Sequence, residues 1–144
     1  MTQTADPTPT AVTRRFLAAM SRLDIDAMFA ELADDVACCF PTAPEGGPRE
    51  IRGRDTNRGF FSGVIRPMLA TYAVTRMNVH LLGDDAEQIV ADYASEGSLI
   101  DGSPYHNTYL ALGMVRGGKI ERWTEFCDPA PILRGIAALQ AGTR

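Results

Sequence analysis

The sequence predicts an α+β domain in which N-terminal helices and a curved antiparallel β-sheet enclose a pocket. Apolar residues recur at helical spacing over residues 10–32 and 56–65, whereas segments typical of strands, joined by Gly and Asp turns, occupy most of residues 72–126. Helices followed by a run of strands are typical of the α+β class. The length of 144 residues suits one hydrophobic core.

The first residues are not expected to belong to the folded domain. Residues 1–9 are polar, contain two prolines and have almost nothing to bury. We therefore predict a disordered N-terminal tail over residues 1–9 and a single domain over residues 10–144.

Three helices are expected before the sheet and one after it. Apolar spacing predicts a helix-turn-helix pair over about residues 10–23 and 24–32, and a third helix over residues 56–65 that ends before Pro67. The amphipathic pattern of residues 132–139 predicts a closing helix.

The remaining segments are predicted to be strands. A short apolar run at residues 36–40 stops at Pro41 and suits a strand that enters the core. Four longer strands are expected to form an antiparallel meander, over residues 72–82, 87–99, 105–115 and 119–126.

Composition and charge exclude several classes of partner. The chain has 18 acidic and 14 basic residues, a net charge of −4, and no basic stripe for nucleic acid. No apolar run approaches the roughly 20 residues of a membrane helix, and the polar start lacks the pattern of a signal peptide. We expect a cytoplasmic protein without nucleic-acid or membrane partners, in which the three cysteines are reduced thiols.

The hairpin loops determine which polar side chains share a row on the predicted sheet. A four-residue loop at residues 101–104 would place Glu96 opposite Tyr109. A three-residue loop at residues 116–118 would place Tyr109 opposite Glu125. The side chains of Glu96, Tyr109 and Glu125 would then form one row across three strands.

Glu125 is the predicted proton donor of this row. Two carboxyl groups beside a phenol in a partly apolar pocket cannot both ionise at low cost, so one pKa should rise. Trp123 and the closing helix are expected to desolvate Glu125 and make it a general acid near neutral pH. The residue pattern leaves open the alternative that Glu96 and Glu125 lie on a solvated convex face.

Neither histidine is predicted to be catalytic. His106 has the opposite parity to Asn107 and Tyr109 and should point to the other face of the sheet, while His80 ends a strand. We expect both at the surface or at an interface. The sequence has no cluster with metal-ligand spacing and no nucleotide-binding fingerprint, so we predict neither a metal nor a cofactor.

Four segments together resemble the SnoaL-like branch of the nuclear transport factor 2-like superfamily. They are LDIDAMFAELADDV at residues 23–36, DGSPYHNTY at residues 101–109, GGKIERWTEFCDP at residues 117–129 and ILRGI at residues 132–136. The resemblance implies a cone-shaped fold around a deep pocket, usually in a homodimer, with Glu125 on the concave face. Members include polyketide cyclases, limonene epoxide hydrolases, ketosteroid isomerases and phenazine biosynthesis A/B proteins, so the fold does not name the reaction.

Of the catalytic residues of these relatives, one has a matching residue type in this sequence. The resemblance places the acid/base carboxylate of the cyclases, epoxide hydrolases and phenazine proteins on Glu125. The catalytic base of the isomerases would fall on Phe40 and their helical tyrosine on Phe16, which argues against the steroid isomerase machinery. The pocket histidine of the cyclases would fall on Ala111.

The leading hypothesis is a cofactor-free enzyme of secondary metabolism, such as antibiotic biosynthesis, that cyclises or isomerises a small apolar or polyketide-like substrate. Glu125 would transfer the proton, and Tyr109 and Glu96 would relay it. Substrate contacts are expected from Asn107, Tyr105, Trp123, Phe40, Phe16, Cys127 and Ala111. Two alternatives remain: an epoxide hydrolase of the limonene type, and a non-catalytic ligand-binding or dimerisation module.

Overall fold

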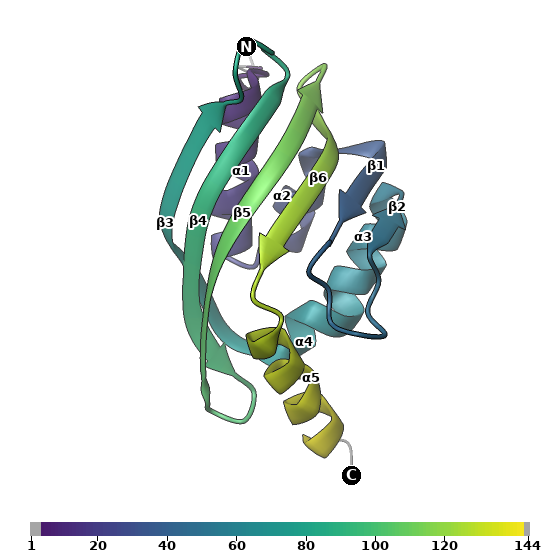
Figure 1. Cartoon of the computed structure of the whole chain (residues 1–144), viewed down its shortest axis with the longest axis vertical. Helices are drawn as coiled ribbons and strands as arrows, with labels where there is room; N and C mark the ends of the chain where they lie inside the picture. The colour runs from purple at the N-terminus through teal and green to yellow at the C-terminus, as the bar shows by residue number, and fades with distance from the viewer. Residues whose placement is uncertain (1–3, 143–144) are drawn as a thin grey trace.

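The structure is a computed structural model that describes residues 4–142 (Figure 1). The helices are α1 (Pro9–Ser21), α2 (Ile25–Ala30), α3 (Arg54–Phe60), the π-helix η1 (Phe61–Ile65), α4 (Arg66–Met68) and α5 (Ala130–Gly142). The strands are β1 (Leu32–Cys39), β2 (Glu50–Arg52), β3 (Leu69–Leu81), β4 (Gln88–Leu99), β5 (Pro104–Arg116) and β6 (Lys119–Cys127). Within the described residues, no helix is both long enough and apolar enough to span a lipid bilayer.

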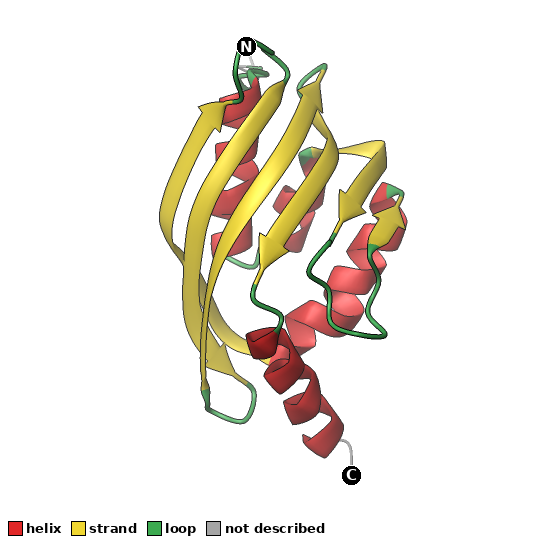
Figure 2. Cartoon of the chain, in the orientation of Figure 1, coloured by secondary structure: helices red, strands yellow, loops and turns green. Residues whose placement is uncertain are grey.

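Six strands form one curved, open sheet in the order β2-β1-β6-β5-β4-β3. All neighbouring strands are antiparallel except β1 and β6, which are parallel. Figure 2 shows α1, α2 and the α3–α4 segment against one face of the sheet, with α5 at its lower end. The predicted α+β class is confirmed, and the short strand β2 is an addition to it.

Local sequence explains where the helices begin and how they continue. The side chain of Asp24 accepts a hydrogen bond from the N–H of Ala27 and caps α2. The third helix was predicted to end before Pro67, but the helical segment continues past it. After α3 the backbone forms the wider turn of the π-helix η1 and then the short helix α4, which contains Pro67. We attribute the wider turn to the proline ring, which in a regular α-helix would clash with the carbonyl of Gly63.

The N-terminal segment contacts the body of the protein before α1 begins. Helix α1 starts at Pro9, and Arg15 donates a hydrogen bond to the carbonyl oxygen of Asp6 (2.7 Å). Residues 1–3 of the predicted tail, residues 1–9, lie outside the described residues.

The loop between β4 and β5 differs from the predicted one. The N–H of Leu99 donates to the carbonyl oxygen of Ser103 (2.8 Å), which leaves a three-residue loop in which Gly102 adopts a φ of +86°. The pairing is therefore three residues away from the predicted register, and Glu96 lies opposite His106. An odd shift moves a side chain to the other face of the sheet.

Glu96 consequently points away from the concave face, and the prediction that it joins the row of Tyr109 and Glu125 is wrong. Its side chain is 64% exposed, and its Oε1 lies 4.0 Å from Nδ1 of His106. The predicted outward direction of His106 is confirmed, since both side chains stand on the outer face.

The register of the hairpin between β5 and β6 also differs from the predicted one. A shift between Met114 and Val115 brings Ala111 opposite Glu125, and Cys127 opposite Tyr109. The difference from the predicted pairing is two residues in this part of the strands. An even difference preserves the face, so Tyr109 and Glu125 still share the concave wall.

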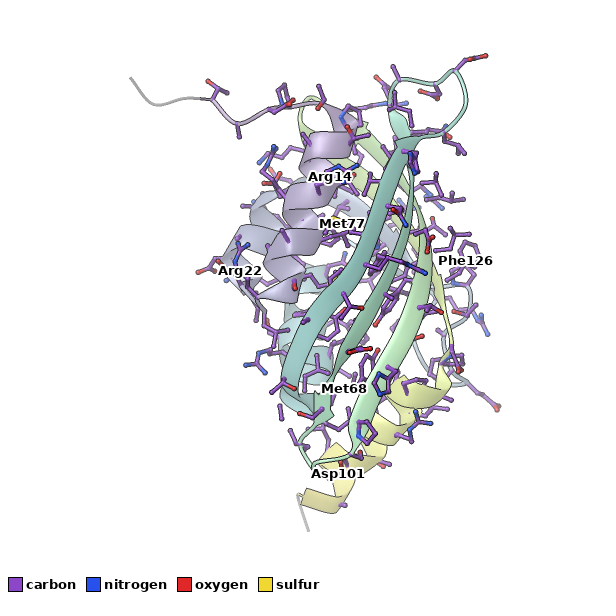
Figure 3. The ribbon with its side chains drawn as sticks, turned by 90° about the vertical axis from the view of Figure 1, so that its left-hand side faces the viewer. Arg14, Arg22, Met68, Met77, Asp101 and Phe126 are labelled. Carbon is purple, nitrogen blue, oxygen red and sulfur yellow. The ribbon has the colours of Figure 1, made fainter. Side chains whose placement is uncertain are left out.

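Helix α1 protects the edge strand β3, beside which it lies in Figure 3. Ser21 accepts a hydrogen bond from the N–H of Val74 (2.9 Å), and Arg14 donates to the carbonyl oxygen of Val79 (3.2 Å). On its sheet-facing side α1 buries Val12 and Leu17 completely. The helix thus covers an exposed strand edge and closes one side of the space beneath the sheet.

Candidate functional site

A cavity of about 210 Å³ lies between the concave face of the sheet and the helices. Its lining is dominated by apolar and aromatic side chains from the helices α1 to α5, the π-helix η1 and the strands β1, β3, β5 and β6. The aromatic members are Phe16, Phe29, Phe40, Phe60, Phe61, Tyr72, Tyr105, Tyr109 and Trp123. Among the described residues that line it, Glu125 is the only acid and there is no Lys, Arg or His.

Glu125 stands in this wall because of its neighbours on β5 and β6. The residue opposite it, Ala111, is fully buried and too small to fill the space above the strand. Two residues earlier on β6, the buried Trp123 packs edge-on against Phe16 of α1, with ring centroids 5.1 Å apart. The carboxyl of Glu125 therefore sits in an apolar surround, and its side chain is only half-buried because the cavity lies on its free side.

One hydrogen bond holds the carboxyl. The hydroxyl of Tyr93, a fully buried residue of β4, donates to Oε1 of Glu125. Burial disfavours the charged carboxylate and raises the pKa of Glu125, while the bond from Tyr93 lowers it by a smaller amount. The net result is a raised pKa, as predicted for a proton donor in an apolar pocket.

A second polar group, which we call the phenol cluster, consists of Tyr105, Tyr109 and Ser95. The hydroxyls of Ser95 and Tyr109 are 2.8 Å apart, and those of Tyr105 and Tyr109 are 3.0 Å apart. Burial raises the pKa of Tyr105 and of Tyr109 above the ordinary value of 10. Both phenols therefore stay protonated and act as hydrogen-bond donors at physiological pH.

Asn107 supports the phenol cluster from behind. Its Oδ1 accepts from the N–H groups of Thr108 (3.0 Å) and Asp128 (3.3 Å). Its Nδ2 donates to the carbonyl oxygen of Asp128 (3.0 Å) and to the hydroxyl of Tyr105 (3.4 Å). The amide thus ties the phenol cluster to the junction between β6 and α5.

The structure gathers most of the predicted site residues around the cavity. Those that line it are Glu125, Tyr109, Tyr105, Trp123, Phe40, Phe16 and Cys127. Three predicted residues do not. Glu96 is on the outer face, while Asn107 and Ala111 are buried behind the wall and do not line the cavity.

Sequence reasoning missed Tyr93, Ser95, Tyr72 and Cys38. Tyr93 and Ser95 were missed because the predicted loop between residues 100 and 105 put their strand in the wrong register. A loop closed by Leu99 and Ser103 pairs Tyr93 with Tyr109. Tyr72 lies beyond the strands whose pairing was predicted, and its ring lies 6.3 Å from that of Tyr105.

The two thiols at the cavity stay protonated at neutral pH. Burial, followed by the nearby Glu125, raises the pKa of Cys38 and of Cys127 to about 12. Because the thiolate is the reactive form, neither thiol is a nucleophile at neutral pH. Within residues 4–142, no group of three His, Cys, Asp or Glu residues is arranged to hold a metal ion.

The raised pKa of Glu125 should make stability depend on pH. Above pH 4.5, the ordinary value, the unfolded chain loses a proton that the folded protein keeps until its own higher pKa. The free energy of unfolding should therefore fall across that window and stay lower above it. Glu125→Gln should abolish this fall, so that the variant exceeds the wild type in stability at pH 8 but not at pH 4. Urea unfolding at both pH values measures the effect, and equal pH dependence in the two proteins would contradict it.

The fold and this cavity define a class of proteins: cone-shaped α+β domains of the nuclear transport factor 2-like type with an internal small-molecule pocket. A family model described as "SnoaL-like domain" matches residues 13–123. The chain therefore belongs to the SnoaL-like family, in agreement with the resemblance seen in its sequence.

The chain is also similar to individual proteins and solved structures. The protein YesE of Bacillus subtilis (strain 168), described as uncharacterized, is 28% identical over 118 residues, which cover 81% of this chain and 78% of YesE. A crystal structure from Bacillus subtilis described as a "putative isomerase" superimposes with a TM-score of 0.78 at 23% identity, covering 90% of this chain and 92% of that one. A "putative polyketide cyclase" from Pseudomonas putida KT2440 gives a TM-score of 0.68 at 21% identity, with coverage of 82% and 90%.

Proposed function

We propose that this protein is a cofactor-free enzyme of secondary metabolism that cyclises or isomerises a small apolar or polyketide-like molecule by general acid/base catalysis. One observation carries the proposal: a single carboxyl, that of Glu125, stands in a cavity lined mainly by apolar and aromatic side chains, with its pKa raised by burial. A carboxyl with a raised pKa holds its proton to a higher pH than usual, so it can give that proton to a substrate and take one back.

The surrounding residues have complementary parts in the proposed reaction. Tyr93 holds one oxygen of the Glu125 carboxyl, and Glu125 lines the cavity. The aromatic walls, including Trp123 and Phe40, would fold a flexible substrate into a reactive shape. The names of the similar structures, isomerase and polyketide cyclase, support this choice of reaction. The direct test is turnover by the Glu125→Gln variant.

Tyr93 gives the proposal a test that needs no substrate. Tyr93→Phe removes the hydrogen bond that favours the carboxylate, so the pKa of Glu125 should rise further. The carbon-13 NMR shift of the Glu125 carboxyl, followed against pH, measures this change.

Tyr109→Phe is the matched control for that measurement. Tyr109 is also buried, and its ring stacks on that of Tyr93 at 4.5 Å with an angle of 8°, but its hydroxyl bonds Ser95 and Tyr105. The control should leave the pKa of Glu125 nearly unchanged. Equal shifts in the two variants would show that Tyr93 has no specific hold on the carboxyl.

We also propose that the protein forms a homodimer and is located in the cytoplasm. The outer face of β5 exposes Leu110 (47%) and Leu112 (38%), and Phe126 pairs with Leu110 from β6. Figure 3 shows Phe126 on the side of the sheet away from α1. Adjacent apolar side chains on a sheet face are typical of an association surface.

A further inference from the structure

Asn57 of α3 is a buried polar residue that has no part in the reaction proposed above. It is 5% exposed and lines the cavity. Its Nδ2 donates to the carbonyl oxygens of Ile51 (3.0 Å) and Gly53 (2.8 Å), at the junction between β2 and α3. Both hydrogens of the amide nitrogen are therefore used within the protein. Since both partners are acceptors, they also determine which end of the amide is the nitrogen.

The oxygen of the same amide is left without a donor. Among residues 4–142, no hydrogen bond is formed to Oδ1 of Asn57. Within the same part of the chain, every completely enclosed side-chain nitrogen or oxygen has a hydrogen-bond partner. Oδ1 is therefore not completely enclosed. Because Asn57 is almost fully buried and lines the cavity, we assign the accessible surface of Oδ1 to the cavity wall.

An accessible amide oxygen in a mostly apolar wall favours one kind of ligand group. A ligand that covers Oδ1 with a methyl group takes it out of water without a hydrogen bond, which is costly. A hydroxyl group covers it and supplies the missing hydrogen. A substrate ammonium group would also supply a hydrogen, but its transfer from water into this cavity costs more than the transfer of a hydroxyl.

Asn57 and Glu125 belong to different parts of the same cavity wall. Ile51, which accepts from Asn57, pairs with Cys38 of β1, and Cys38 pairs in turn with Trp123 of β6. Since neighbouring strands are about 4.8 Å apart, roughly 10 Å of sheet separates Ile51 from the strand that carries Glu125. A molecule that contacts both residues is held at two separate points, which limits it to one orientation.

We propose that Asn57 is a specificity-determining residue, whose Oδ1 accepts a hydrogen bond from a hydroxyl group of the substrate while another part of the substrate lies at Glu125. The bonds from Nδ2 to Ile51 and Gly53 hold the amide in this orientation. The assignment deepens the proposed function and rests on it only in taking the cavity as the substrate site. A substrate analogue with a methyl group in place of the hydroxyl leaves Oδ1 unpaired and is discriminated against.

Two probes of nearly equal shape, 2-naphthol and 2-methylnaphthalene, test the proposal when the protein is titrated into each of them in a calorimeter. The ratio of the two dissociation constants, methyl compound over naphthol, measures the preference for the hydroxyl. In Asn57→Leu this ratio should fall about tenfold from its wild-type value, which corresponds to one hydrogen bond at a buried acceptor. A purely structural role of Asn57 would weaken the binding of both probes alike and leave the ratio unchanged.

Asn78→Leu is the matched control for this substitution. It makes the same chemical change on β3, at an exposed residue that is not part of the cavity lining. The ratio of the dissociation constants should stay at its wild-type value.

A second measurement uses the wild-type protein and does not depend on the folding of a variant. Accepting a hydrogen bond moves the carbon-13 resonance of an amide carbonyl downfield. The resonance of the Asn57 side-chain carbonyl should therefore move further downfield with 2-naphthol than with 2-methylnaphthalene.

Four results would each overturn the proposal: an unchanged ratio in Asn57→Leu, an equal fall in Asn78→Leu, equal carbonyl shifts with the two probes, or no binding of 2-naphthol. Turnover is not measured in these experiments. A failure of Glu125 as the catalytic acid would therefore leave the role of Asn57 standing, and an unchanged binding ratio would leave the role of Glu125 standing.

Discussion

Glu125→Gln should lower turnover by about 10²–10⁴-fold, the usual contribution of one general acid or base. Glutamine has nearly the same shape and can still accept the hydrogen bond from Tyr93, so the cavity should keep its form. It cannot release a proton to the substrate. The loss should therefore appear in kcat, with a much smaller change in the binding of cavity ligands.

Glu96→Gln is the matched control for this substitution. The same chemical change is made on the same sheet, but at a side chain that is 64% exposed on the outer face. Turnover should stay at the wild-type level. A substrate for both assays can be found by screening small apolar and polyketide-like molecules for a raised melting temperature, followed by product analysis. Full activity of Glu125→Gln, or a large loss in Glu96→Gln, would remove Glu125 from its proposed role.

The contrast between these two carboxylates shows what the sequence could predict about the site. Side-chain parity placed Glu125 on the same face as Tyr109, and this survived because its register error was an even number of residues. For Glu96 the error was odd, so the side chain moved to the other face. The odd error at Glu96 comes from the length of the β4–β5 loop, which depends on the backbone conformation of Gly102. The residue types of this loop did not determine that conformation.

The sequence predicted the fold more completely than it predicted the hydrogen-bond partners of the site residues Glu125 and Tyr105. Long apolar periodicities located α1 and the four strands of the meander, because burial of one face requires them. The bond from Tyr93 to Glu125 joins residues 32 positions apart and depends on the register of both hairpins. The support of Tyr105 by Asn107 likewise depends on the position of the chain at Asp128. Such contacts between strands follow from the tertiary structure rather than from local pattern.

Gly97 is the residue at which the sheet and the site depend most directly on each other. It pairs with Tyr72 of β3 on one side and with Tyr105 of β5 on the other. A β-carbon at this position would lie 2.1 Å from the carbonyl oxygen of Thr71 and 3.0 Å from the Cα of Tyr72. These are backbone atoms that cannot rotate away, so the close approach requires glycine.

Gly97→Ala should therefore lower the free energy of unfolding by about 3 kcal/mol, the upper end of the usual cost of overfilling a packed site, because the atoms it meets are backbone. Gly59→Ala, in α3, makes the same change where a β-carbon would meet no atom within 4 Å, and should raise the free energy of unfolding by up to about 1 kcal/mol. Urea unfolding of both variants measures the two effects, which have opposite signs. If Gly97→Ala retains wild-type stability, the backbone of β3 cannot lie as close to β4 as the structure places it, and the neighbouring contact between Tyr72 and Tyr105 would need revision as well.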